Sequence, residues 1–282
     1  MNDDQRRREL ADLLRSRREL LRPEDYGLAH GVRRRTSGLR REEVAMLSSV
    51  SPSWYTWLEQ GRKIRPSLQT LRRISQVLRL SEQEWLYASL LAQFEPNGDP
   101  PTTISKPAIS ITSLQNILDA FTTAPAVLYN SRFDILAANA AARSVYGHDV
   151  ATATKWEHNM LWRFFMDKDR RKMYPDAVSD LGIQNLIETL RMNWASNHDG
   201  VEELIDELRH TSNEFDHIWN ARKVAKLAIV PGRVRLPGHK EAISIQYTRF
   251  YVSELAGHAI AALVPTTSQH SLVLQKYLDQ TG

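Results

Sequence analysis

Only two residues, Ser49 and Val50, separate two short helix signals in LRREEVAMLSSVSPSWYTWLEQGRK. In the second helix, Ser51 can accept the free N–H groups of the first turn, and Pro52 suits the first helical position. This helix is expected to end just before Gly61, which suits the left-handed residue after a last turn. Two helices joined by so short a turn must cross steeply, so the sequence predicts a helix-turn-helix.

The second of these helices has two unlike faces. At about 100° per residue, Tyr55 and Leu58 fall on one side, which we expect to face a core. Ser53, Trp57 and Gln60 fall on another side, which we expect to be exposed. The second helix of a helix-turn-helix is shaped to enter the major groove of DNA, so the exposed side is the candidate contact surface.

Charge is distributed unevenly along the chain. Residues 1–80 hold 18 Lys and Arg against 10 Asp and Glu, and the remaining 202 residues hold 19 against 23. The first part therefore has a net charge of +8 and the second a net charge of −4. A basic module suits a polyanion, because each phosphate that Lys or Arg neutralises releases condensed counterions. The N-terminal part is predicted to bind double-stranded DNA.

The segment GLRREEVAMLSSVSPSWYTWLEQGRKIRPSLQTLRRISQVLRLSEQE resembles bacterial helix-turn-helix regulators of the xenobiotic-response-element type. Two positions depart from that family, which usually has glycine in place of Ser49 and arginine in place of Trp57. The resemblance implies a homodimer that binds two half-sites on double-stranded DNA. It also implies that base edges face Pro52, Ser53 and Trp57, and that phosphates are held by Arg41, Arg62 and Lys63.

Four prolines and a glycine concentrate in EPNGDPPTTISKPAI, a composition that stops helices and is typical of a linker. The sequence therefore predicts a multidomain chain. We expect an all-α helix-turn-helix domain over residues 1–94, a proline-rich linker over 95–112 and a second domain over 113–282.

The second domain mixes strands and helices. Two short strands are predicted over 126–129 and 134–137, followed by a helix that Asn139 begins. The middle, 159–225, has a helical pattern, so we expect an α/β domain of the α+β kind, with helices on one face of a sheet and room for a cavity. The remaining strands are expected over 227–236, 242–252 and 258–267, with a closing helix over 272–278.

This domain resembles the MmyB-like ligand-binding domain in LQNILDAF, FDILAANAAAR and SNEFDHIW. The resemblance runs from Leu114 to Tyr277 and implies a PAS-like fold that accommodates a small apolar ligand such as a fatty acid. Lys168 replaces a usual proline, and the histidine that family members have near Leu236–Gly238 is absent. Together the two resemblances imply a transcription regulator with a sensor domain.

Large side chains of the second domain are candidates for lining the cavity, although most must also be needed in the core. Arg163 and Arg191 stand within apolar helical patterns. Such an arginine either extends its charged end to water or anchors a carboxylate, and the first reading is favoured for both. The candidate ligand-binding residues are Leu128, Leu136, Met160, Phe164, Phe165, Arg191, Phe215, Trp219 and Tyr247.

Several classes of function are disfavoured by what the sequence lacks. The absence of cysteine excludes disulfides, thiol catalysis and zinc fingers. The chain contains no HExxH, no GxSxG and no phosphate-binding glycine loop, so we expect no enzyme activity, no catalytic cofactor and no metal. No signal segment or membrane span is evident, which favours the cytoplasm. One alternative stays open, in which the second domain binds a protein partner and no small ligand.

Overall fold

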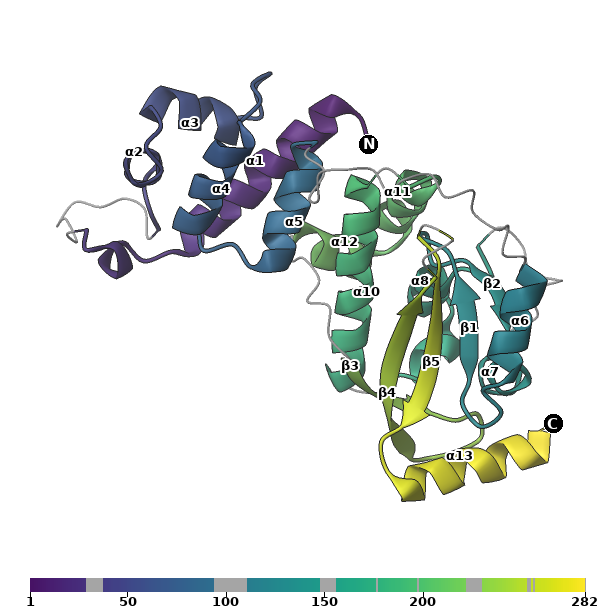
Figure 1. The fold of residues 1–282 in the computed structure, drawn as a ribbon. Helices are drawn as coiled ribbons and strands as arrows, with labels where there is room; N and C mark the ends of the chain where they lie inside the picture. Colours follow the sequence, from purple (N-terminus) through teal and green to yellow (C-terminus); the bar gives the residue numbers. More distant parts are fainter. Residues whose placement is uncertain are drawn as a thin grey trace. The chain divides into compact units, whose positions relative to one another are not determined.

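The computed structural model describes residues 1–28, 38–93, 111–147, 156–175, 177–196, 198–221, 230–252, 255 and 257–281. The chain divides into two compact units, Met1–Pro100 and Pro101–Gly282 (Figure 1). Of the predicted linker over 95–112, only the last two residues are described, and they open a helix at Ile111.

The described part of the N-terminal unit is helical. At four of its helix starts, the side chains of Asn2, Ser51, Ser67 and Ser81 each accept a backbone N–H of the first turn. The elements are α1 (Asp3–Leu20), a 3-10 turn (Pro23–Tyr26), α2 (Arg41–Leu47), α3 (Pro52–Glu59), α4 (Leu68–Val77) and α5 (Glu82–Leu91).

The predicted helix-turn-helix is confirmed in α2 and α3, which pack against each other. The turn passes through Ser49, whose φ of 56° lies in the left-handed region. α3 begins at Pro52 as predicted and is followed by Gly61 with a φ of 65°. A left-handed serine is strained, because its Cβ crowds the neighbouring carbonyl oxygen where a glycine would not.

The C-terminal unit contains a five-stranded antiparallel sheet with the order β2-β1-β5-β4-β3. Its strands are β1 (Ala126–Tyr129), β2 (Ile135–Ala138), β3 (Val230–Arg235), β4 (Ala242–Tyr251) and β5 (Ala259–Pro265). Its helices are α6 (Ile111–Asp119), α7 (Ala140–Tyr146), α8 (Met160–Met166), α9 (Lys168–Lys172), α10 (Ala177–Ala195), α11 (Val201–Thr211), α12 (Asn213–Asn220) and α13 (Ser268–Thr281). The predicted α+β class is therefore confirmed, and β1 has the predicted bounds.

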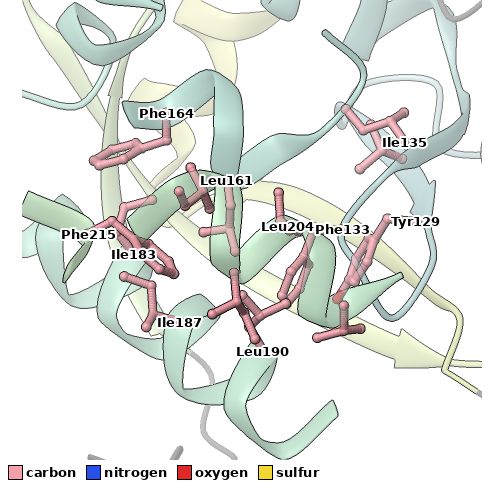
Figure 2. Close-up of a cluster of buried hydrophobic side chains, with 14 of the residues drawn as sticks. Tyr129, Phe133, Ile135, Leu161, Phe164, Ile183, Ile187, Leu190, Leu204 and Phe215 are labelled. Carbon is pink, nitrogen blue, oxygen red and sulfur yellow. The ribbon is translucent and has the colours of Figure 1, made fainter. Parts of the chain in front are cut away.

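Helices cover both faces of this sheet, and not one face as predicted. α8, α10, α11 and α12 pack on the face that carries Val127 and Tyr129, where Figure 2 shows their apolar side chains converging. α6 covers the opposite face, where its Leu114 and Leu118 pack with Leu128. Figure 1 shows α6 beside β1 and β2. β1 is consequently buried along its whole length.

Two buried asparagines tie helix starts to the sheet. Asn139 caps α7 and also accepts the N–H of Ala126 in β1 at 3.0 Å. Asn159 caps α8 and donates from Nδ2 to Asp134 Oδ1 at 2.8 Å. The start of α8 is therefore fixed beside the hairpin between β1 and β2.

Candidate functional site

α3 presents an exposed aromatic face on the N-terminal unit. Pro52 and Ser53 are exposed, and Trp57 leaves 42% of its surface accessible. The guanidinium carbon of Arg62 lies 5.6 Å from the centroid of the Trp57 ring. Arg62 and Lys63 are both exposed beyond the end of the helix. An apolar surface thus adjoins a cationic one, an arrangement that suits base or sugar edges next to phosphates.

A buried carboxylate holds Arg41 near this face. Glu59 is fully buried and accepts from Arg18 Nε at 2.5 Å and from Arg41 Nε at 2.7 Å. Burial alone would lower the pKa of Arg18, but the Glu59 carboxylate raises it above its usual value. The Arg41 side chain remains 39% exposed. It is therefore held by the buried Glu59 carboxylate and still faces solvent. Glu59 was not predicted from the sequence, because a glutamate in a short surface helix is usually solvated.

An apolar cavity lies inside the C-terminal unit, between the sheet and the helices α8 and α10. The cavity has a volume of about 80 Å³, so it is narrow. About 930 Å³ of space lies between its atoms when the open solvent at its mouth is included. Its apolar lining includes Val127, Ile135, Met160, Phe164, Ile183, Leu186 and Leu263.

One cluster of polar side chains in the cavity wall surrounds Arg170. Its guanidinium carbon lies 4.1 Å from the centroid of the Tyr146 ring. Burial raises the pKa of Tyr146 well above its usual value, and burial likewise raises that of Tyr247, with Tyr174 and Tyr146 adding to the shift. The phenols therefore stay protonated and can donate hydrogen bonds.

A second cluster of polar side chains in the cavity wall surrounds Arg249. Its Nη1 donates to Thr189 Oγ1 at 3.1 Å, and its Nη2 donates to Asn185 Oδ1. Burial raises the pKa of Tyr129 to about 12, although the nearby Arg249 charge opposes the rise. Arg249 is therefore held by uncharged acceptors at the cavity wall.

Both units match family models. A helix-turn-helix domain model matches residues 9–86, and the model of the MmyB-like transcription regulator ligand binding domain matches residues 112–276, more than half of the chain. The chain belongs to this MmyB-like family. No curated protein matches it significantly. The chain is thus a DNA-binding transcription regulator with a ligand-binding domain, and both matched families are regulatory binding domains and not enzymes.

Three of the predicted ligand residues line the cavity of the MmyB-like domain. Met160 and Phe164 reach it from α8, and Tyr247 reaches it from β4. Three others lie behind these in the adjoining core, where their rings contact one another in an edge-to-face and a stacked pair: Phe165, Phe215 and Trp219.

Leu128 and Leu136 do not line the cavity, contrary to the sequence-based prediction. Both pack against α6 on the opposite face of the sheet, away from the cavity. Side chains alternate along a strand, so Val127 and Tyr129 point to the cavity side and Leu128 to the other. A strand that is apolar at every position gives no sign of which residues face which layer.

Arg191 was predicted to extend to water or to bind the ligand, and it lies elsewhere. It is only 1% exposed, donates from Nη2 to the Trp219 carbonyl, and stacks its guanidinium carbon 4.0 Å from the Trp219 ring centroid. It therefore reaches neither water nor the cavity lining. Arg163 is more exposed and lies 3.6 Å from Asp167 Oδ2.

Five polar residues of the cavity lining were not predicted from the sequence: Tyr146, Arg170, Tyr174, Asn185 and Arg249. Arg170 belongs to KDRRK, which reads as a solvated turn of helix, and the tyrosines lie on separate segments. No local pattern brings these residues together. Within the described residues, no cluster of His, Asp or Glu could hold a metal, and no helix there is long and apolar enough to cross a membrane.

Proposed function

We propose that this regulator binds an elongated apolar molecule, for which a fatty acid is our candidate, in the cavity of its MmyB-like domain. The observation that supports the proposal is a narrow cavity whose lining is mostly apolar. Each buried methylene contributes about 0.8 kcal/mol, so a chain of about a dozen carbons can bind well after the entropy of ordering it. The proposed role includes no catalytic step and no catalytic cofactor.

We also propose how the N-terminal unit binds DNA in the cytoplasm. A homodimer would place two copies of α3 in successive major grooves. Pro52, Ser53 and Trp57 would face base edges because they are exposed on one helix. The phosphates would be held by Arg41, Arg62 and Lys63.

A second candidate has a protein partner in place of the small ligand. Phe250 and Val264, which are 48% and 41% exposed, support it as apolar positions on the sheet that a partner could cover. The cavity favours the small ligand, because its apolar wall can pack closely against a ligand tail.

Organic extraction of the purified protein tests the ligand proposal. We expect an apolar chain molecule in the extract, and we expect its return to the stripped protein to raise the melting temperature. A protein that releases nothing apolar and is not stabilised by added fatty acids would contradict the ligand proposal and favour the protein partner. The DNA-binding assignment would be unaffected.

Replacing Trp57 by arginine should change the base that is preferred at one position of each half-site. Indole has one N–H donor and an apolar face, whereas a guanidinium can make the two-pronged contact with guanine. Selection from a random duplex library would measure the preference. The melting temperature should change little, because Trp57 is exposed.

The matched control is Trp54→Arg, since Trp54 is half-buried in the same helix. This variant should lower the melting temperature without a new base preference. If Trp57→Arg instead unfolds the protein or leaves the selected sequence unchanged, α3 does not contact bases through Trp57.

A further inference from the structure

Neither arginine of the cavity wall, Arg170 or Arg249, forms an ion pair with a described acid, and Arg170 is the more deeply buried of the two. Arg170 is 7% exposed, and its Nη1 donates only over long distances, to the Tyr146 carbonyl at 3.4 Å and Met173 Sδ at 3.7 Å. Among the described residues, no carboxylate oxygen lies within 4.0 Å of its guanidinium. A buried guanidinium without a paired anion is unfavourable, so an anion that enters the cavity would stabilise Arg170.

The carboxylate of Asp167, three residues before Arg170, is engaged elsewhere. Asp167 caps α9, where its Oδ1 accepts the backbone N–H of Arg170 at 3.0 Å, and its Oδ2 lies 3.6 Å from Arg163. Burial lowers the pKa of Arg163, and the positive charge of Arg170 lowers it further. Among the described residues, Arg163 therefore adds positive charge near Arg170.

The other polar groups near Arg170 are phenols, which can donate hydrogen bonds. Tyr146, Tyr174 and Tyr247 line the same part of the cavity and interact with one another. A guanidinium has five N–H donors and no acceptor, and a protonated phenol donates one further hydrogen. A group of this kind is complementary to an anion that enters from the cavity.

Arg249 offers a useful contrast on the same cavity wall. Its guanidinium donates to Thr189 and Asn185, so two of its donors already have good acceptors. Arg249 is also half-buried, whereas Arg170 is almost fully buried. An incoming anion would consequently stabilise the Arg170 guanidinium more than the Arg249 guanidinium.

We infer that Arg170, with the hydroxyls of Tyr146, Tyr174 and Tyr247, binds the carboxylate of an amphiphilic ligand whose tail fills the apolar part of the cavity. This inference rests on the proposed function and assigns a specificity-determining residue to it. The cavity should therefore select by charge at the ligand head as well as by the apolar tail. A neutral amphiphile would leave the guanidinium unpaired, and a cationic one would be repelled.

Three probes with the same tail test this inference on the full-length protein after bound lipid has been stripped: dodecanoic acid, dodecanol and dodecylamine. Calorimetric titration should show the acid binding about 10- to 100-fold more tightly than the alcohol, the gain expected of a charge-assisted contact. The amine should bind more weakly than the alcohol. Equal affinity for the acid and the amine would overturn the inference without any variant.

Two matched variants locate the anion. Arg170→Met should reduce the affinity for dodecanoic acid about 10- to 100-fold and leave the affinity for dodecanol within about threefold. Arg249→Met should leave the preference for the acid in place. If Arg170→Met does not fold, Arg170→Lys retains the charge and should keep a reduced preference for the acid.

The outcomes separate this inference from the proposed function. A preference for the acid that survives Arg170→Met but is lost in Arg249→Met would place the head at the other guanidinium and overturn the inference. Binding of all three probes with equal affinity would overturn it too, while leaving an apolar ligand site. Binding of none of them to the wild-type protein would contradict the proposed function itself.

Discussion

Replacing Glu59 by alanine should lower the free energy of unfolding of the N-terminal unit by about 3–5 kcal/mol, as expected for breaking a buried ion pair. The side chains of Glu59 and Arg18 are 0% and 5% exposed, so removing the carboxylate leaves the Arg18 charge buried without its main partner. Arg41 would lose its Nε acceptor at the same time. Hydrogen exchange of the amides in α3, followed by mass spectrometry, would measure the loss.

Glu42→Ala is the matched control for this prediction. Glu42 is exposed in the first turn of α2, where a negative charge interacts with the helix dipole by about 0.3–1 kcal/mol. The control should therefore have only a small effect. Similar losses for the two variants would show that the buried cluster of Arg18, Glu59 and Arg41 does not stabilise the fold as described.

Replacing Ile183 by tryptophan should abolish ligand binding while the domain stays folded. Ile183 lies on α10 and lines the cavity, so a larger ring at this position would fill the narrow space. Excluding about four methylenes from the cavity would weaken binding by more than about 100-fold. Overpacking should lower stability by about 1–3 kcal/mol. Titration with dodecanoic acid and thermal melting would measure the two effects.

Leu128→Met provides the control on the opposite face of the sheet. Leu128 is fully buried against α6, so a volume-conserving change there should leave ligand affinity unchanged. If Leu128→Met weakens binding as much as Ile183→Trp, the ligand occupies a different place in the domain.

The sequence predicted the local structure of the helix-turn-helix well, because its determinants are local. Ser51 caps α3, Pro52 starts it and Gly61 follows it, each through its own backbone preference. Trp57 was predicted to be exposed from helical spacing alone, and it is. Glu59 could not be assigned in this way, because its burial depends on arginines that come from α1 and α2.

The arrangement of the C-terminal domain was harder to predict. β1 has the predicted bounds, but β2 begins one residue later than predicted, after Phe133, which takes a left-handed φ of 67°. The continuous apolar strands suggested burial without showing that α6 covers the second face. The cavity could not be predicted from the sequence, because its lining residues come from separate elements. Tyr146, Arg170 and Arg249 belong to α7, α9 and β4 and line one cavity only in the folded domain.

We propose that a ligand in the MmyB-like domain controls the DNA affinity of the regulator. A ligand can do this only if it prefers one conformation of the protein over another, and typical couplings change affinity about 5- to 150-fold.

The most direct measurement is the affinity of the full-length protein for a selected duplex, by fluorescence anisotropy, with and without dodecanoic acid and over a range of salt concentrations. We predict that affinity falls about 10³- to 10⁵-fold between 50 and 200 mM salt, as for some 6–10 phosphate contacts, and that the acid shifts the dissociation constant at fixed salt. A dissociation constant that the acid leaves unchanged at every salt concentration would contradict this control by the ligand. Binding that is absent at low salt, or that does not change with salt, would contradict the proposed mode of DNA binding.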